Sequence, residues 1–183
     1  MALHPFRIAG IVLGAFSVVC AAFLLIGLAL PATWEAERTT RIQAPPDEVF
    51  PLLSAASRWE EWTPTPASGV ELFGPGAGPG SGRRWDDAAY GEGEFVITSA
   101  VPVREVVYEV AVEEGAIRVR GQIELTAVGG DTRIRWRETG DFGWNPLLGY
   151  LAGRMGEMQG EQLGLSLDAL RRLVEQGVSE PPG

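Results

Sequence analysis

The sequence predicts an α+β fold in which an antiparallel sheet packs against a long C-terminal helix, with a separate apolar helix at the N-terminus. Residues 8–30 contain no charged side chain. Apolar and polar residues then alternate with a period of two through the middle of the chain, which is typical of strands with one buried face. The last long segment has helical periodicity instead. The length of 183 residues fits one domain with accessory segments.

The uncharged run Ile8–Leu30 is predicted to be a transmembrane helix. As a helix it would span about 35 Å, enough to cross a hydrocarbon core of roughly 30 Å. Arg7 precedes the run and Glu35 follows it, so the positive-inside rule favours a short cytoplasmic N-terminus (residues 1–7) and an exported domain. A cleaved signal peptide is the first alternative, although its apolar region is usually about 7–15 residues. A buried helix of a soluble protein is the second alternative.

The composition of the remaining chain excludes several kinds of site. All fifteen basic residues are arginine, and the formal charge of −9 argues against a nucleic-acid-binding surface. The only histidine is His4 and the only cysteine is Cys20, so no His, Cys or Lys follows Thr33. We therefore expect no Cys/His zinc site, no other metal site and no cofactor in the domain, and no nucleic-acid partner. Any chemistry there must use Asp, Glu, Tyr, Ser, Thr or Arg.

The middle of the chain is predicted to begin with a strand and two short helical segments. The strand covers Trp34–Ile42, a helix covers Pro46–Ser54, and a helical turn covers Ser57–Trp62. The glycine- and proline-rich segment Phe73–Gly82 is typical of a loop. Strands joined by short links then indicate an antiparallel meander, with predicted ranges Arg83–Ala88, Glu92–Val101, Glu105–Glu113, Ala116–Ala127 and Thr132–Phe142.

The last three of these strands have one apolar face and one charged face. The apolar face carries Val106, Tyr108, Val110, Val112, Ile117, Val119, Gly121, Ile123, Leu125, Ile134 and Trp136. The charged face is rich in arginine, but acidic residues are available as cross-strand partners. We therefore favour a solvated ladder of ion pairs over an anion-binding surface.

The C-terminal segment Asn145–Gln176 is predicted to be one amphipathic helix of about 45 Å, with Pro146 in its first turn. Residues 177–183 are predicted to be a disordered tail, so the domain covers residues 34–176. The helix carries an unusual row of glycines on one flank: Gly149, Gly153, Gly156, Gly160 and Gly164. Each costs about 1 kcal/mol relative to alanine. Either the sheet approaches this flank closely, or the missing side chains leave room for a ligand.

Several stretches resemble the START/polyketide-cyclase-like superfamily, called SRPBCC. The most specific is the strand-to-helix segment Ile42–Phe50, and the others are Trp59–Trp62, Trp85, Gly91–Phe95, Asp131–Trp136 and Gly164–Leu170. The resemblance covers Trp34–Gln176 and implies a helix-grip fold, in which a curved antiparallel sheet wraps around the long C-terminal helix. It also implies a cavity for lipids, polyketides or other apolar molecules. The N-terminal anchor is not part of the family pattern.

With this fold, the concave face of the sheet would present aromatic and aliphatic side chains to a hydrophobic ligand. The predicted ligand-binding residues are Trp62, Trp85, Phe95, Tyr108, Ile123, Trp136, Gly153, Gly156 and Gly160. The alternative is that the large side chains fill a solid core under the helix.

Glu138 continues the apolar face of its strand, so it is expected to point inward near the strand end. A desolvated carboxylate there would have a raised pKa and could act as an acid or base. We favour the alternative that Glu138 reaches solvent or an arginine at the sheet edge. No catalytic residue is therefore predicted, and Glu138, Tyr108 and Glu94 are the weak candidates.

The sequence thus favours a membrane-anchored domain that binds a hydrophobic small molecule or lipid. Two other functions stay open. One is a cyclase/aromatase-like enzyme acting on an enolisable carbonyl compound, and the other is a protein-interaction module with a filled cavity.

Overall fold

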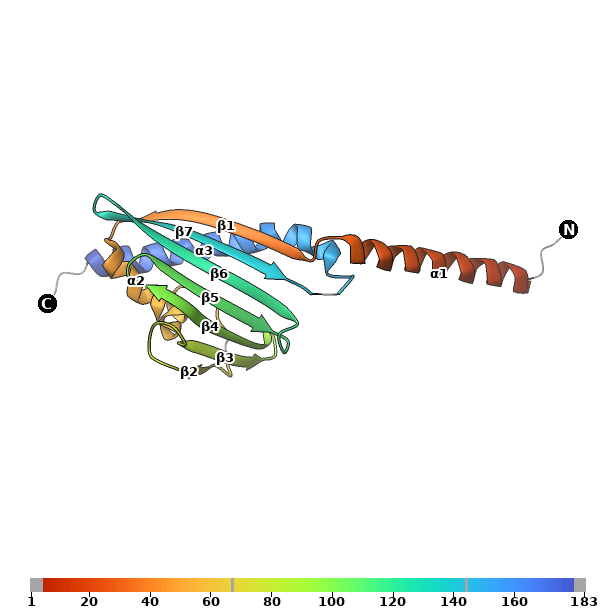
Figure 1. Cartoon of the computed structure of the whole chain (residues 1–183), viewed down its shortest axis with the longest axis horizontal. Helices are drawn as coiled ribbons and strands as arrows, with labels where there is room; N and C mark the ends of the chain where they lie inside the picture. Colours follow the sequence, from red (N-terminus) through yellow and green to blue (C-terminus); the bar gives the residue numbers. More distant parts are fainter. Residues whose placement is uncertain (1–4, 67, 144, 180–183) are drawn as a thin grey trace.

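A seven-stranded antiparallel sheet organises the chain, with helices against one face and a long helix extending from one end (Figure 1). This computed structural model describes residues 5–66, 68–143 and 145–179. The helices are α1 (Pro5–Ala29), α2 (Pro46–Ser54), the 3-10 helix η1 (Ala56–Glu61) and α3 (Gly149–Ser179). The strands are β1 (Thr33–Ile42), β2 (Glu71–Phe73), β3 (Gly82–Asp87), β4 (Gly91–Val101), β5 (Glu105–Val112), β6 (Ile117–Val128) and β7 (Asp131–Asp141).

The strand order is β1-β7-β6-β5-β4-β3-β2, so the first strand of the chain pairs with the last and the others follow as a meander. This confirms the α+β helix-grip architecture with its long C-terminal helix and its N-terminal apolar helix. One strand was not predicted. β2 pairs with β3 from Glu71 to Phe73, and the glycine-rich loop begins only at Gly74.

Side chains alternate between an inner face, which is buried, and an outer face, which is solvated. In β7, Ile134, Trp136 and Glu138 are buried and the arginines between them are exposed. Arg137 forms ion pairs with Glu35 at 3.3 Å and with Glu37 at 3.0 Å. Further cross-strand pairs join Arg135 to Glu124, Arg120 to Glu109, Arg84 to Glu94 and Arg41 to Asp131. The predicted ladder of ion pairs is therefore confirmed.

α2 and η1 close the inner face at the end of the sheet farthest from α1 (Figure 1). α2 begins with Pro46 in its first turn, where the absent backbone N–H needs no partner, and buries Val49, Leu52 and Leu53. The predicted boundaries of α2 are confirmed. η1 spans Ala56–Glu61 and places Trp59 and the following Trp62 under the sheet, where both are buried.

α3 differs from the predicted helix at both ends. Asn145 and Pro146 form a turn before the helix, in which the Asn145 side chain accepts a hydrogen bond from the backbone N–H of Leu147. The helix therefore begins at Gly149, and the prediction that Pro146 lies in its first turn is wrong. At the other end α3 continues to Ser179, so residues 177–179 of the predicted tail are helical. Residues 180–183 lie outside the described residues.

α1 leaves the domain next to the start of β1 and projects away from the sheet (Figure 1). Within it, Gly10–Ala29 has a mean hydropathy of 2.7 and is long and apolar enough to cross a membrane. Only 6% of the residues in its most apolar stretch are buried against the rest of the structure. The helix begins at Pro5, earlier than the predicted Ile8, and residues 1–4 of the predicted cytoplasmic segment lie outside the described residues.

Candidate functional site

An aromatic cluster fills the inner face beneath α2 and η1. Trp59 is at its centre, with its ring centroid 4.5 Å from that of Phe95 and 4.8 Å from that of Tyr108. Trp62 and Trp136 complete it, with their rings 5.5 Å apart. The indole Nε1 of Trp59 donates to the Leu53 carbonyl at 2.9 Å, which fixes the ring against α2. This half of the inner face is therefore a packed core.

A buried polar network adjoins the aromatic cluster. The Tyr108 hydroxyl donates to one oxygen of the Glu138 carboxylate in a short hydrogen bond, and it accepts from Nε1 of Trp136 at 2.8 Å. Nε2 of Gln159, on α3, donates to the other Glu138 oxygen at 2.7 Å. Glu138 is 5% exposed. It therefore points inward as its strand position indicates, and the favoured alternative, contact with solvent or an arginine, is wrong.

Burial is the main cause of the shifted pKa values of Glu138 and Tyr108. It raises the pKa of Glu138, while the hydrogen bonds from Tyr108 and Gln159 partly lower that pKa. The pKa of Tyr108 is raised well above its usual value by burial, and then by the charge of Glu138 and the hydrogen bond to it. A carboxyl group that is easier to protonate than usual, held by a neutral phenol, can exchange a proton with a bound molecule.

The other half of the inner face, toward α1, is only half-buried. We call it the open end and define it by Trp85, Val110, Val112, Ile117 and Val119. These residues lie in two rows across the sheet. The register gives Arg83–Phe95–Val110–Val119–Gly140–Trp34 as the first row and Trp85–Gly93–Val112–Ile117 as the second. The Glu138–Tyr108 network lies immediately beside the first row.

The path of α3 explains why the open end is left uncovered. A Cβ atom on Gly156 would lie 2.6 Å from the Glu35 carbonyl oxygen, and one on Gly160 would lie 2.5 Å from the Arg38 guanidinium. The helix thus runs tightly along β1, at the edge of the sheet. Near the start of α3, Leu151 is 53% exposed, and Met155 only partly covers the core. Close approach is therefore the role the geometry shows for Gly156 and Gly160.

The other predicted site residues separate into distinct places. Ile123 is fully buried in the core, and Trp85 lies at the open end with its ring over Gly93. Gly153 has open space where a side chain would be. Glu94 lies on the outer face, paired with Arg84 at 3.2 Å, and does not join the Glu138–Tyr108 network. The ligand-binding role of the predicted residues stays a prediction.

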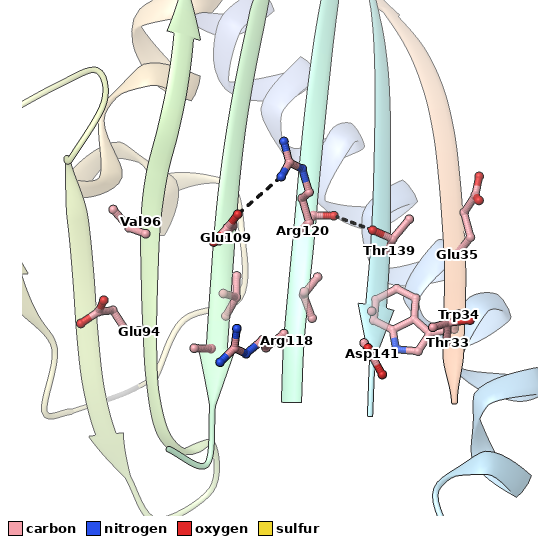
Figure 2. Close-up of a pocket in the computed structure, with 14 residues that line it drawn as sticks. Thr33, Trp34, Glu35, Glu94, Val96, Glu109, Arg118, Arg120, Thr139 and Asp141 are labelled. Carbon is pink, nitrogen blue, oxygen red and sulfur yellow. Dashed lines mark hydrogen bonds and ion pairs between the residues drawn. The ribbon is translucent and has the colours of Figure 1, made fainter. Parts of the chain in front are cut away.

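Glu94 instead lines a hollow of about 740 Å³, mostly on the outer face of β4–β7 and β1 (Figure 2). Four residues of the first row also contribute to its lining: Trp34, Val110, Val119 and Gly140. Small residues such as Ala111 and Thr139 form part of it, and charged side chains surround them. Arg120 reaches across toward Glu109 at 3.6 Å, as the dashed line in Figure 2 shows. Four acidic side chains and two arginines line the hollow, so it continues the ion-pair ladder with an excess of negative charge.

Three residues of the inner face were missed by the sequence analysis: Trp59, Gln159 and Arg83. The motif Trp59–Trp62 contained a signal for the first, since both indoles point inward from one helical turn. Gln159 carried no signal, because it lies between Met158 and Gly160 on a helix whose polar residues mostly face solvent. Arg83 is 8% exposed, and its position opposite Phe95 on the inner face is clear only from the strand register.

Similar folds occur in proteins of diverse origin. Norcoclaurine synthase of Thalictrum flavum, a point mutant bound to a transition-state analogue, superposes with a TM-score of 0.63 at 14% identity, over 80% of this chain and 97% of that one. The two-domain aromatase/cyclase BexL of the BE-7585A pathway superposes with a TM-score of 0.57 at 20% identity. The match covers 82% of this chain and 52% of BexL. DynU16, from the dynemicin biosynthetic locus, superposes with a TM-score of 0.57 at 15% identity. The match covers 78% of this chain and 48% of DynU16.

This chain thus spans about half the length of BexL and of DynU16. At these identities the likeness is one of fold. No curated protein matches the sequence significantly. Residues 33–175, however, match the family described as polyketide cyclase / dehydrase and lipid transport. That match covers the whole sheet, α2, η1 and nearly all of α3, so the chain belongs to this family within the SRPBCC superfamily.

Proposed function

We propose that this protein is a membrane-anchored domain that binds a hydrophobic small molecule or lipid at the open end of its inner face. The observation that carries the proposal is the position of the half-buried apolar rows. They lie at the end of the sheet from which α1 leaves, whereas α2 and η1 close the opposite end. A ligand leaving a bilayer crossed by α1 would meet this end first. The family description, which includes lipid transport, supports the same function.

The chemistry of the open end also supports binding. Its apolar side chains would lose contact with water when an apolar ligand covers them, which contributes about 25 cal/mol per Å². The Glu138–Tyr108 network beside the first row supplies the few polar groups that usually orient a ligand in an apolar site.

Two neighbouring residues on opposite faces of β5 provide the test. Val110 belongs to the open end and Ala111 to the outer face, and both are half-buried. The full chain, purified in detergent, is titrated with the fluorescent fatty acid cis-parinaric acid. Val110→Gln is expected to weaken binding about tenfold, because the probe must then bury an amide. Ala111→Gln is the matched control and should bind as the natural chain does.

Absence of probe binding by the natural chain would contradict the proposal. Equal loss in the two variants would contradict the assignment of the site to the inner face. The first result would favour the protein-interaction module, since the described inner face would then have no ligand.

A second candidate function is a cyclase-like enzyme, and the buried Glu138–Tyr108 pair is the observation that favours it. The Glu138 carboxylate would take a proton from a carbon next to a carbonyl group, while a hydrogen bond from Tyr108 would stabilise the enolate oxygen. The test is incubation with a poly-β-keto thioester. Turnover that Glu138→Gln abolishes and Glu94→Gln preserves would establish this function.

A further inference from the structure

We infer that Arg83 and Trp85 form a binding site for the anionic oxygen-bearing head of the ligand, so that the molecule bound at the open end is an amphiphile such as a fatty acid. This inference rests on the proposed function and specifies its ligand class. The two residues project from the same face of β3, at the end of the first and second rows respectively.

The central observation is a set of buried donors without acceptors. In the described part of the chain, the buried side-chain atoms that make no hydrogen bond are Nε of Arg83, Nε1 of Trp85 and Nε1 of Trp34. All three belong to the two rows that border or form the open end. A buried donor without a partner destabilises the folded chain, because it has lost its hydrogen bonds to water. Two of the three, those of Arg83 and Trp85, are neighbours on one face of β3, which indicates that an acceptor from outside the chain belongs there.

Arg83 is unusual because its charge is buried without a carboxylate partner. It is 8% exposed, and no described carboxylate lies within ion-pairing distance of it. Its guanidinium carbon lies 5.4 Å from the centre of the Phe95 ring. Burial lowers the pKa of Arg83, and the more distant carboxylate of Glu60 partly raises that pKa. An oxyanion would neutralise this charge where the chain itself does not.

The spacing of the donors fits one head group. Residues two apart on one face of a strand are separated by about 7 Å, so an oxyanion between Arg83 and Trp85 can accept from both. Trp34 ends the first row on β1, roughly 24 Å away at the usual strand spacing, and is too distant to share that group. With the head at β3, the apolar tail would lie over Val110 and Val119 in the direction of Gly140.

The test compares cis-parinaric acid with its methyl ester, which has the same tail and no charge, on the full chain in detergent. The natural chain is expected to bind the acid at least tenfold more tightly than the ester. Arg83→Met should remove this preference and leave ester binding nearly unchanged. Arg84→Met is the matched control, because Arg84 is the next residue and lies on the outer face, paired with Glu94 at 3.2 Å.

Trp85→Phe is a second variant that removes one donor and keeps an aromatic ring, and it should reduce the preference several-fold even if Arg83→Met does not fold. Oleoyl lysophosphatidic acid, used as a competitor of cis-parinaric acid, tests a phosphate head against a carboxylate head. Binding of either head group that depends on Arg83 supports the site. Equal binding of acid and ester by the natural chain would overturn the inference while leaving the proposed function intact. Absence of binding by both probes would overturn both.

Discussion

At the scale of single residues, Glu138 gives the domain a distinctive dependence on pH. Burial raises its pKa above the ordinary value of 4.5, so over the window between the two values the folded chain binds a proton that the unfolded chain releases. The stabilisation from this group is therefore complete below about pH 4.5 and is lost as the pH rises through the raised pKa. Each unit of the shift corresponds to about 1.4 kcal/mol.

We expect Glu138→Gln to remove the pH-dependent part of the stability that Glu138 contributes. The free energy of unfolding of the natural chain should fall relative to that of the variant as the pH rises from about 4 to about 8. Urea unfolding at several pH values measures the difference, and Glu94→Gln on the outer face is the control. Parallel pH profiles for the natural chain and Glu138→Gln would show that Glu138 titrates in the folded state as it does in the unfolded chain.

Glycines within the strands have a residue-scale role that the sequence alone did not reveal. Phe73 lies opposite Gly82, Trp85 opposite Gly93, Tyr108 opposite Gly121 and Trp34 opposite Gly140. In each pair a Cβ atom on the glycine would lie 2.0–2.3 Å from the aromatic ring. The rings thus lie flat across their neighbours, and the absence of a side chain on Gly121 is what lets Tyr108 reach Glu138.

At the scale of elements, the glycines of α3 fall into two kinds that a pair of substitutions separates. A Cβ atom on Gly153 would have nothing within 4 Å, whereas one on Gly156 would lie 2.6 Å from the Glu35 carbonyl oxygen. Gly153→Ala should therefore stabilise the chain by about 1 kcal/mol through helix propensity. Gly156→Ala should destabilise it by about 1–3 kcal/mol, because α3 must move away from β1.

Urea unfolding of the two variants in the same detergent measures both changes. Gly164→Ala is a further control, since Gly164 also has open space around its Cα. Equal stabilisation by Gly153→Ala and Gly156→Ala would show that contact with β1 does not depend on the glycine.

The same helix shows how far periodicity can predict an element. The apolar stripe of its C-terminal half was predicted correctly, and Leu163, Leu167, Leu170 and Val174 are buried. Toward the N-terminal end, Leu151 belongs to the same stripe but is exposed. Periodicity identifies a face, but it does not specify whether the helix lies over the centre of the sheet or along its edge. Backbone contacts at Gly156 decide that, and they depend on the fold.

At the scale of the whole molecule, the fold was predictable because most strands of the meander alternate between apolar and polar residues, and short links leave few topologies. The inner site was predictable only in part. Tyr108, Trp136 and Glu138 follow from the strand pattern, but Gln159 meets Glu138 only because α3 runs along β1, the strand next to β7. The division of the inner face into a packed half and an open half depends on where α2, η1 and α3 lie, and no local pattern encodes it.

The junction between α1 and the domain determines how the open end would face a bilayer. The rings of Phe23 and Tyr150 stack with centroids 4.5 Å apart and an interplanar angle of 3°, and the Tyr150 hydroxyl donates to the Phe23 carbonyl at 2.6 Å. Gly27 allows a still closer contact, because a Cβ atom there would lie 2.1 Å from the Pro146 carbonyl oxygen. The end of α1 and the start of α3 are therefore joined by direct packing as well as by the chain.

We expect Tyr150→Ala to loosen this junction without unfolding the sheet. Loss of the stacked pair and of the hydrogen bond should increase amide hydrogen exchange about tenfold or more in the peptides covering residues 145–155 of the full chain in lipid nanodiscs. Exchange in β5–β7 should be unchanged, because the aromatic cluster is not altered. Tyr90→Ala, at an exposed position of the β3–β4 hairpin, is the control. Unchanged exchange at residues 145–155 would mean that the Gly27–Pro146 contact alone holds α1 against α3, so that the orientation of the open end does not depend on Tyr150.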